Sequence, residues 1–463
     1  MIGRPLRGLS RRAVAGVLLC SAAVAAPVVA NEPAQPRLAF TLDQRLEASG
    51  NTRLSIPSEG STVQSVTRLG FALTSDTRVE QLRLTGSSAF RLGRTPDGRI
   101  NEFDDPRLGL SYRREAGDSE FAVSATVRRS QLEFLRLTDF LDEDGNLDLP
   151  EDFEDLVRTG RRTSYDLDGR LLIGREAAPF GVTLTLGVGG IDYSSGAPLA
   201  DIRTWRAGVQ TRARLSPVMT ATLGYQRQER REEAAPRNLR VTDAVSAGLS
   251  YDVSRRTQVS ASLGWTRVDR TGTLTRRQEG LTGSFGLNTD TPLGPVGLTL
   301  SAQQIEAGER VSGSVNRTLA LPGGGNLSGS VGIVQQAGGD PALIGRLGWS
   351  RPLPSGGINL SLARAAIGND DPRIRTTLSS GLTHEINRVS SVRVNANFAQ
   401  TTGSATRNQL EQADLSATYS HQLTPDWALT SGVGYRLRRE GSLGRANSPE
   451  VFVGMGRSFD WPL

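Results

Sequence analysis

The stretch VTLTLGVG, residues 182–189, alternates strictly between apolar and small or polar side chains. From Val182 to Val188 every second residue is aliphatic, and threonine or glycine occupies the positions between. A period of two predicts a β-strand with one apolar face. The same pattern recurs along the chain, for example in FAVSATV (121–127), MTATLGY (219–225), VSASLGW (259–265) and WALTSGVGY (427–435). The sequence therefore predicts an all-β protein.

The alternating segments number about 22, counted as runs of roughly ten residues bounded by turn signals. The first lies near 37–46 and the last near 449–461. Connections after even-numbered segments are mostly tight, such as 216–217, whereas those after odd-numbered segments are mostly longer and charged or glycine-rich, such as 227–239. An even count with sorted connections is typical of a transmembrane antiparallel up-and-down β-barrel. A soluble sandwich with Greek-key connections would not sort its loops in this way. Because a few segments could pair outside a membrane, the expected range is about 18 to 22 strands.

The chain ends EVFVGMGRSFDWPL, residues 450–463, with the odd positions from Val451 to Trp461 forming a face that is apolar except at Arg457. Chain ends of soluble proteins are usually frayed and polar. We therefore expect the last strand to pair with the first and to close the barrel. A charged residue on the outer face is costly in a bilayer, so Arg457 needs an explanation.

This ending resembles that of bacterial outer-membrane β-barrels of the porin-like kind, although no subfamily is identified. The resemblance implies that Phe459 and Trp461 form the signal that the barrel assembly machinery reads. Pro462 and Leu463 depart from the pattern, since the family usually stops on the aromatic residue. Outer-membrane lipid and the assembly machinery are the partners that this resemblance implies.

The N-terminus predicts the compartment. Residues 1–30 contain four arginines, no acid, and the apolar run AVAGVLLCSAAVAAPVVA (13–30), which ends on small residues. This pattern is typical of a secretory signal peptide cleaved after Ala30. Residues 31–463 would then form the barrel in the outer membrane, reached through the periplasm. Cys20 is the only cysteine, so the predicted mature chain has no disulfide and no cysteine metal ligand.

Composition excludes some functions. All 54 basic residues are arginine, and the net charge of +6 falls to about +2 without the four arginines of residues 1–30. This balance does not predict nucleic-acid binding. Only 37% of residues are hydrophobic, which is low for a soluble domain of this length. No run after residue 30 approaches the roughly 18 apolar residues of a membrane helix.

Arginine recurs opposite the apolar face of the predicted strands, whereas most acids fall in connections. We expect these arginines to line the lumen and to favour anions, because charges in a low-dielectric channel focus its field. The predicted lumen-lining residues are Arg113, Arg128, Arg206, Arg212, Arg214, Arg346, Arg393, Arg436 and Arg438. Asp414 is the clearest acid on the same face.

Residues 130–160 form the longest connection, an acidic outer loop that also carries many apolar residues. Its apolar residues predict that it packs against something, either at the surface or inside the lumen, and 151–157 is compatible with a short helix. The stretch DEDGNLD resembles the start of a calcium loop, but no glycine stands at the sixth position. Calcium is therefore a weak candidate cofactor, and no other cofactor is expected. Its candidate ligands are Asp142, Asp144, Asn146, Asp148 and Asp152.

The two histidines, His384 and His421, lie next to short predicted turns with no evident nucleophile or acid nearby. We interpret them as interfacial residues at strand ends and expect no enzymatic activity. Since 22-stranded transporters carry a plug and only about six residues separate Ala30 from the first predicted strand, we also expect no plug domain.

The function that follows is a channel for passive diffusion of polar solutes, anions included. One alternative is an exporter of exopolysaccharide or another polymer, working with periplasmic partners. A second alternative is an outer-membrane enzyme or adhesin that acts through its outer loops.

Overall fold

The computed structural model describes residues 36–142, 144–150, 153–155, 160–175, 178–194, 199–233, 237–272, 275–404, 407–441 and 443–462. The predicted signal peptide, 1–30, lies outside the described residues. No helix within the described ranges is long and apolar enough to cross a membrane.

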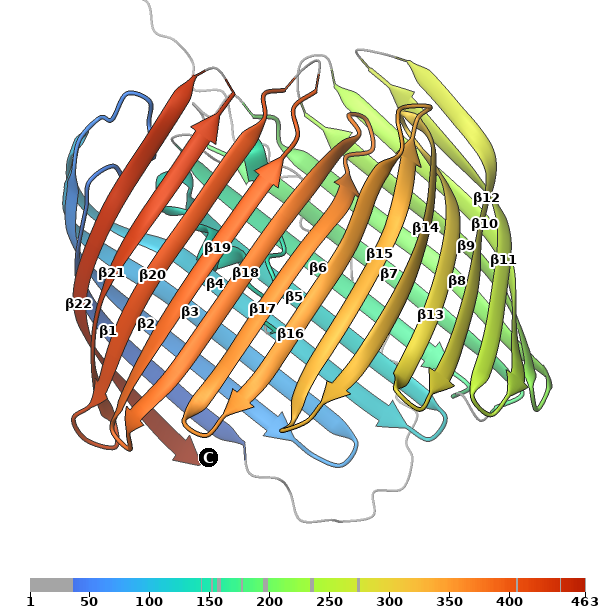
Figure 1. The fold of residues 1–463 in the computed structure, drawn as a ribbon, viewed down its shortest axis with the longest axis horizontal. Helices are drawn as coiled ribbons and strands as arrows, with labels where there is room; N and C mark the ends of the chain where they lie inside the picture. The colour runs from blue at the N-terminus through green and yellow to red at the C-terminus, as the bar shows by residue number, and fades with distance from the viewer. Residues whose placement is uncertain are drawn as a thin grey trace, which may run out of the picture. The chain divides into compact units, whose positions relative to one another are not determined.

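The described residues form 22 β-strands and three short 3-10 turns (Figure 1). The strands are β1 Arg37–Ser49, β2 Thr62–Asp76, β3 Glu80–Thr95, β4 Gly98–Ala116, β5 Ser119–Gln131, β6 Arg161–Ile173, β7 Phe180–Tyr193, β8 Ile202–Ser216, β9 Met219–Glu232, β10 Asn238–Ser254, β11 Thr257–Thr271, β12 Arg276–Thr291, β13 Gly294–Ile305, β14 Gly308–Leu321, β15 Gly325–Gln336, β16 Ala342–Leu353, β17 Gly356–Ile367, β18 Arg373–Asn387, β19 Ser390–Thr401, β20 Leu410–Gln422, β21 Trp427–Glu440 and β22 Gly444–Pro462. The turns are η1 Leu132–Phe134, η2 Leu137–Phe140 and η3 Phe153–Asp155.

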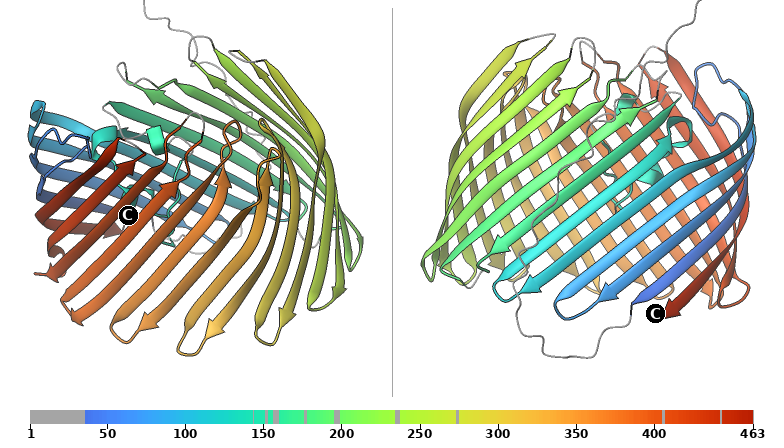
Figure 2. Two further views of the ribbon diagram at one scale, coloured as in Figure 1. Left: turned by 45° about the horizontal axis from the view of Figure 1, so that its top comes forward. Right: turned by 180° about the vertical axis from the view of Figure 1, so that it is seen from behind.

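Each strand pairs antiparallel with its neighbours in sequence, and β1 pairs with β22, so the sheet closes on itself. Figure 2 shows the resulting ring of tilted strands from two further directions. The predicted all-β, up-and-down barrel of 22 strands is confirmed. Closure leaves no strand edge exposed, which is what a sheet in a bilayer requires.

The register of closure places Leu38 opposite Trp461 and Phe40 opposite Phe459. The Trp461 ring meets the Phe40 ring edge to face at 5.9 Å between centroids and stacks on the Phe459 ring at 6.1 Å. The last apolar residues therefore form part of the seam between the first and last strands rather than a frayed end.

Connection lengths follow the predicted sorting. Connections after even-numbered strands are short, from two residues at 217–218 to six at 174–179. They lie at the end of the barrel where β22 finishes (Figure 1). Connections after odd-numbered strands include 50–61 and 132–160, although 96–97 and 306–307 are tight turns.

Alternation in the sequence predicts a fourth strand near 107–115, but β4 begins at Gly98, directly after the tight turn at 96–97. A β-bulge interrupts the alternation of this strand. The register shifts between Ser87 and Ala89 of β3, and Asp105 of β4 has a φ of 53°. A bulge adds one residue and moves the following side chains to the other face, so Asp104 and Arg107 both point inward and the period of two is lost.

The outer surface of the barrel is apolar. Large hydrophobic side chains are exposed along the strands, with Leu263 and Leu281 reaching 73% and 72% exposure. They alternate with small and polar residues on the inner face, as in β7 and β11. An apolar exterior over a polar interior is the arrangement that lipid imposes on a barrel.

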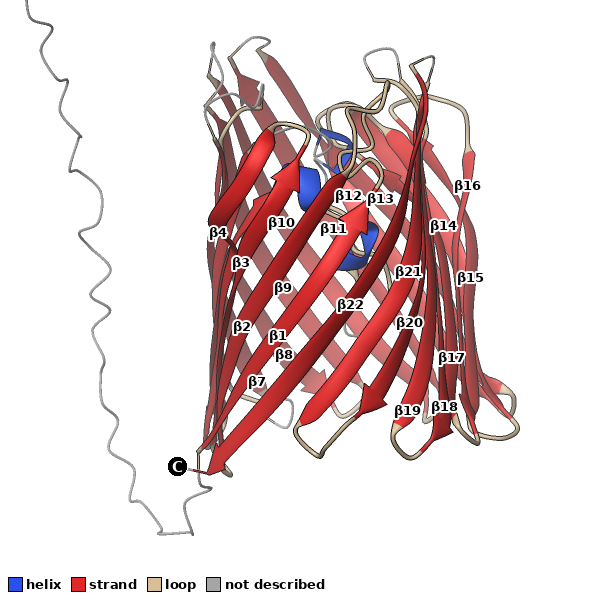
Figure 3. Ribbon diagram, turned by 90° about the vertical axis from the view of Figure 1, so that its left-hand side faces the viewer, coloured by secondary structure: helices blue, strands red, loops and turns tan. Residues whose placement is uncertain are grey.

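The main apolar cluster lies inside the barrel. Leu132, Leu137 and Phe153 of the 132–160 connection pack with Ala399 of β19 and Leu410 of β20. Both wall residues lie on the inner face of their strands. In Figure 3 the helical turns lie within the ring of strands. The apolar residues of the long acidic connection therefore pack in the lumen and not at the surface.

Candidate functional site

The structure places all nine of the predicted lumen-lining arginines on the inner face, the face opposite the exposed apolar side chains. Arg206, Arg212 and Arg214 of β8, for example, alternate with exposed Trp205 and Leu215. The others lie on the inner face of their own strands: Arg113 on β4, Arg128 on β5, Arg346 on β16, Arg393 on β19, and Arg436 and Arg438 on β21.

Many acids share this face, which corrects the interpretation that acids are largely confined to connections. Arg206 contacts Asp166 at 3.2 Å and Asp168 at 2.9 Å, both on β6. Asp414, 7% exposed, faces inward as predicted, directly opposite Arg436 in the register of β20 and β21.

Most of the nine arginines have partners. Arg113 contacts Glu120 at 2.8 Å and Arg128 lies 3.9 Å from Asp139. Arg212 donates to the carbonyls of Gly174 and Arg175, at 3.2 Å and 2.6 Å. Arg436 pairs with Glu450 at 2.5 Å, and Arg438 pairs with Glu440.

Arg346 and Arg393 differ from the rest. No ion pair or side-chain hydrogen bond reaches either guanidinium from the described part of the chain. Both lie on the part of the wall from β15 to β19, where the inner face carries several arginines and Glu385 as its acid. This five-strand part of the lumen wall is therefore positively charged.

The 132–160 segment is held in the lumen by ion pairs at two places. At the first, Arg136 contacts Glu450 of β22 at 3.0 Å and Glu47 of β1 at 3.7 Å. Burial disfavours the charged form of Arg136, but the charges of Glu450 and Glu47 outweigh burial and raise its pKa. The guanidinium thus ties the segment to the seam at which the barrel closes.

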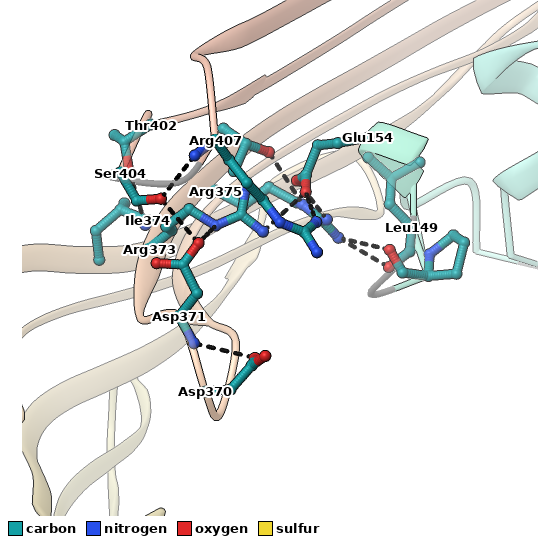
Figure 4. Close-up of polar contacts among 12 residues, drawn as sticks. Leu149, Glu154, Asp370, Asp371, Arg373, Ile374, Arg375, Thr402, Ser404 and Arg407 are labelled. Atoms are coloured by element: carbon teal, nitrogen blue, oxygen red, sulfur yellow. Dashed lines mark hydrogen bonds and ion pairs between the residues drawn. The ribbon is translucent and has the colours of Figure 1, made fainter. Parts of the chain in front are cut away.

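At the second place, one carboxylate meets three arginines (Figure 4). Glu154 of η3 lies 2.8 Å from Arg373 and 3.0 Å from Arg375, both on β18, and 3.4 Å from Arg407 in the β19–β20 connection. We call these four residues the Glu154 cluster. The side chains of Arg373, Arg375 and Glu154 are only 4%, 7% and 9% exposed. Glu154 therefore attaches the segment to the positively charged part of the wall from β15 to β19.

Further hydrogen bonds fix the position of the segment. Arg375 donates to the carbonyls of Leu149 and Pro150 at 3.0 Å and 3.2 Å, and Ser379 donates to the carbonyl of Gly145 at 2.6 Å. Bonds between a wall strand and backbone carbonyls specify one docked conformation. The segment consequently narrows the lumen.

The Glu154 carboxyl is ionised at neutral pH. Burial opposes its ionisation, but the charges and hydrogen bonds of Arg375 and Arg373 outweigh burial and hold the pKa of this carboxyl below its ordinary value. Charge-assisted, multiply hydrogen-bonded pairs of this kind are the stronger class of ion pair.

Two cavities open near the cluster. The larger, ≈ 570 Å³, is lined by residues that include Arg162, Tyr165 and Arg206. The smaller, ≈ 230 Å³, is lined by Arg373 and Arg407 of the cluster. Arg230, Arg240 and Glu306 line both, so the two cavities adjoin.

Sequence reasoning missed the residues that organise this site. Arg373 and Arg375 follow the same rule as the predicted arginines, because they stand two apart at the start of a strand. The signal was therefore present in RIRTTL, 373–378. Their partner Glu154 was not predictable in this role, since it is more than 200 residues away in sequence.

The weak calcium candidates are arranged differently from a calcium loop. The Asp142 carboxylate accepts from the Asn146 backbone N–H at 2.7 Å and from its side-chain amide at 3.0 Å. Asp144 and Asp148 are exposed. Asp152 lies outside the described residues. Among the described residues, no three His, Cys, Asp or Glu side chains are grouped so as to hold a metal.

Each histidine has a serine beside it, which the sequence did not indicate. His421 Nδ1 lies 2.8 Å from Ser390 Oγ, and His384 Nδ1 lies 3.1 Å from Ser355 Oγ. Both rings lie on the outer face of their strands. In the described ranges no carboxylate contacts either ring, so the serine–histidine pairs have no acid to orient them.

Arg457 is accommodated on the outer face by aromatic rings. Its guanidinium lies 4.2 Å from the Phe459 ring centroid and 5.2 Å from that of Trp427, the first residue of β21. A cation over an aromatic face is stabilised even where water is scarce. Its position at the end of the barrel, level with a strand's first residue, lets the long stem reach the interface.

No known family model matches the sequence, and no curated protein matches it. Solved structures with a similar fold include a variant of the ferric enterobactin receptor of Pseudomonas aeruginosa in complex with enterobactin, with a TM-score of 0.55 and 11% identity over 92% of this chain and 82% of that one. The iron transporter FrpB of Neisseria meningitidis gives a TM-score of 0.55 and 8% identity over 90% and 81% of the two chains. The siderophore receptor PirA of Pseudomonas aeruginosa gives 0.51 and 11% over 92% and 80%.

These similarities concern the fold, and they agree with the closed sheet and the apolar exterior. The chain has the closed β-barrel fold of these outer-membrane proteins, and its apolar exterior is suited to a lipid bilayer.

Proposed function

We propose that the protein is an outer-membrane channel through which polar solutes diffuse passively, anions in preference to cations. The observation that carries this proposal is the positively charged part of the lumen wall from β15 to β19, where Arg346 and Arg393 have no partner among the described residues. Arginine side chains lining a pore bias it toward anions and phosphate-bearing solutes.

The position of the 132–160 segment supports a selective passage. A 22-stranded barrel is wide, and barrels of this size enclose a plugged lumen. The described residues contain no separate plug domain, but the segment reaches from the seam at Glu450 to β18 and occupies part of the lumen. It would act as a constriction that sets the size of permeant solutes.

The similar solved structures also support transport. They are named as receptors for ferric enterobactin and siderophores and as an iron transporter. That supports a transport role for this barrel, whereas passive diffusion is proposed from its own lumen.

Uptake into liposomes tests the proposal. Liposomes containing the folded protein, placed in isotonic solutions of small polar solutes, should swell faster than liposomes with heat-denatured protein. Two salts are then compared: the potassium salt of a small organic anion, with valinomycin to carry potassium, and the chloride salt of a similarly sized organic cation, with a carrier for chloride. The organic anion should enter faster than the organic cation. Absence of swelling for every solute would contradict a diffusion channel. It would favour the alternatives of polymer export or a surface enzyme or adhesin.

A further inference from the structure

The Glu154 cluster contains more positive charge than its carboxylate neutralises. Three guanidiniums from β18 and the β19–β20 connection converge on one carboxylate. A second acid, Asp371, lies 3.4 Å from Arg373. Removing charged groups from water is costly unless partners compensate them, so the buried Arg373 and Arg375 require anionic partners.

One donor of the cluster is unused. Nη1 of Arg373 is buried and has no hydrogen-bond partner among the described residues, and the whole side chain is only 4% exposed. Buried N–H groups are nearly always hydrogen-bonded, and an unpaired one needs an explanation. A guanidinium presents paired N–H groups that match the oxygens of carboxylates and phosphates.

A space of suitable size adjoins Arg373. Arg373 and Arg407 line the ≈ 230 Å³ cavity, and Arg230, Arg240 and Arg270 complete its basic lining. Its acids are Glu232, Glu306, Asp370 and Asp371. Arg240 and Arg270 already pair with Glu306. Arg373, whose Nη1 has no hydrogen-bond partner among the described residues, is thus part of the wall of this cavity.

We propose that Arg373, Arg375 and Arg407 form a binding site for an oxyanion group of a solute, phosphate or carboxylate, and that Glu154 occupies this site in its absence. The anion reaches Arg373 through the adjoining cavity and competes with Glu154. Its binding detaches η3 from β18 and loosens the constriction. The regulatory consequence rests on the proposed function, whereas the binding site itself does not.

Competition makes a quantitative prediction. A ligand that binds only after an internal competitor has left shows an apparent affinity equal to its intrinsic affinity multiplied by the fraction of sites that are open. Removing the competing charge should therefore tighten binding, which is the opposite of what loss of an ordinary binding residue does.

Calorimetry of inorganic phosphate with the detergent-solubilised, folded protein tests the site without any channel measurement. Glu154→Gln should bind phosphate about tenfold more tightly than the wild type, or better. The double variant E154Q/R373Q should lose that binding. Asp340→Asn is the matched control, because Asp340 is an exposed acid of the β15–β16 connection outside the cluster, and it should behave as the wild type.

The proposal is overturned if E154Q binds phosphate no more tightly than the wild type, or if E154Q/R373Q binds as tightly as E154Q. Heat-modifiable electrophoretic mobility reports folding of each variant. If E154Q does not fold, Glu154→Ala takes its place. The wild type and R373Q are then also compared at high phosphate concentration, and R373Q must lose the phosphate binding that the wild type shows. Failure of the proposed channel function would leave these binding results unchanged, so the two proposals fail separately.

Discussion

Single side chains decide what is inside this barrel and what stays outside. Arg457 lies on the lipid face against two aromatic rings, whereas Glu154 lies in the lumen against three guanidiniums. In each case the charge is placed where a partner compensates its desolvation. Leaving Arg373 and Arg375 buried without the carboxylate would cost on the order of 3–5 kcal/mol.

Acidification provides a test at this scale. The pKa of Glu154 is lowered in the folded protein from an ordinary value of 4.5. The charged groups facing it are Arg373 and Arg375 of β18 and Arg407 of the β19–β20 connection, with Asp371 beyond Arg373. Because the folded pKa lies below the unfolded one, the ion pairs contribute fully above pH 4.5 and are lost as pH falls through the lowered value.

We therefore expect single-channel conductance to stay constant from about pH 7 to 5 and to rise only below the ordinary carboxyl range. E154Q, which cannot titrate at this position, should lack that acid-induced rise. A conductance rise between pH 7 and 5 in the wild type would show that another group controls the segment.

A second test at the residue scale concerns Trp461. Trp461→Asp places a charge on the lipid face of the closing seam and removes the ring contacts with Phe40 and Phe459. We expect loss of outer-membrane insertion, measured as loss of the heat-modifiable folded form in membrane fractions. Trp461→Phe, which keeps an aromatic ring, is the control and should insert. Normal insertion of the aspartate variant would contradict a role of this residue in assembly.

At the scale of elements, the strands were predictable and the lumen segment was not. Alternation is a local property, because lipid on one side and a polar lumen on the other impose a period of two on every strand. It failed at β4, where the bulge at Asp105 breaks the period. Alternation also predicted that Arg212 and Arg393 lie on the inner face. It did not predict the ion pair of Arg206 with Asp166, because that pair depends on strand register.

The location of residues 132–160 could not be read from the sequence, because its contacts join distant positions. Its apolar residues predicted that the segment packs against something, but they did not identify what. The residues it packs against, on β19 and β20, follow more than 230 residues after Phe153. The Glu154 cluster is a tertiary feature of the same kind.

A disulfide tether tests whether this segment controls the passage. A Cβ built at Gly145 would lie 3.9 Å from Cγ of Asn359 on β17, so the two positions are neighbours and a pair of cysteines there can be oxidised if the segment shifts to bring their Cβ atoms to about 4 Å. The φ of +81° at Gly145 makes the substitution strained, at a cost of roughly 1 kcal/mol. The only native cysteine, Cys20, lies in the predicted signal peptide.

E154Q should conduct more than the wild type, because η3 is no longer held against β18 by the Glu154 charge. In this background, oxidation of the G145C/N359C pair should lower the conductance to the wild-type level, and reduction should raise it again. Either single cysteine variant is the control and should not respond to reduction. If the oxidised tether leaves the E154Q conductance unchanged, movement of the segment away from β17 and β18 does not account for the wider passage.

At the scale of the whole molecule, the barrel combines a closed ladder, an apolar exterior and an asymmetric lumen. The wall from β15 to β19 carries arginines that include Arg346 and Arg393, whose guanidiniums have no partner in the part of the chain that the structure describes. An internal segment attached to this wall by one acid leaves the remaining positive charge facing the passage. Focusing of that field by the low-dielectric wall is the physical basis for anion preference.

The reversal potential of the folded wild-type protein in a planar bilayer, under a potassium chloride gradient, tests this claim most directly. The sign should be that of chloride selectivity, and it should move toward zero when Arg212, Arg214 and Arg393 are neutralised together. The preference should also weaken at high salt, where the Debye length falls to about 3 Å at 1 M. A reversal potential of the opposite sign, that of a potassium-selective pore, would contradict an anion-preferring channel.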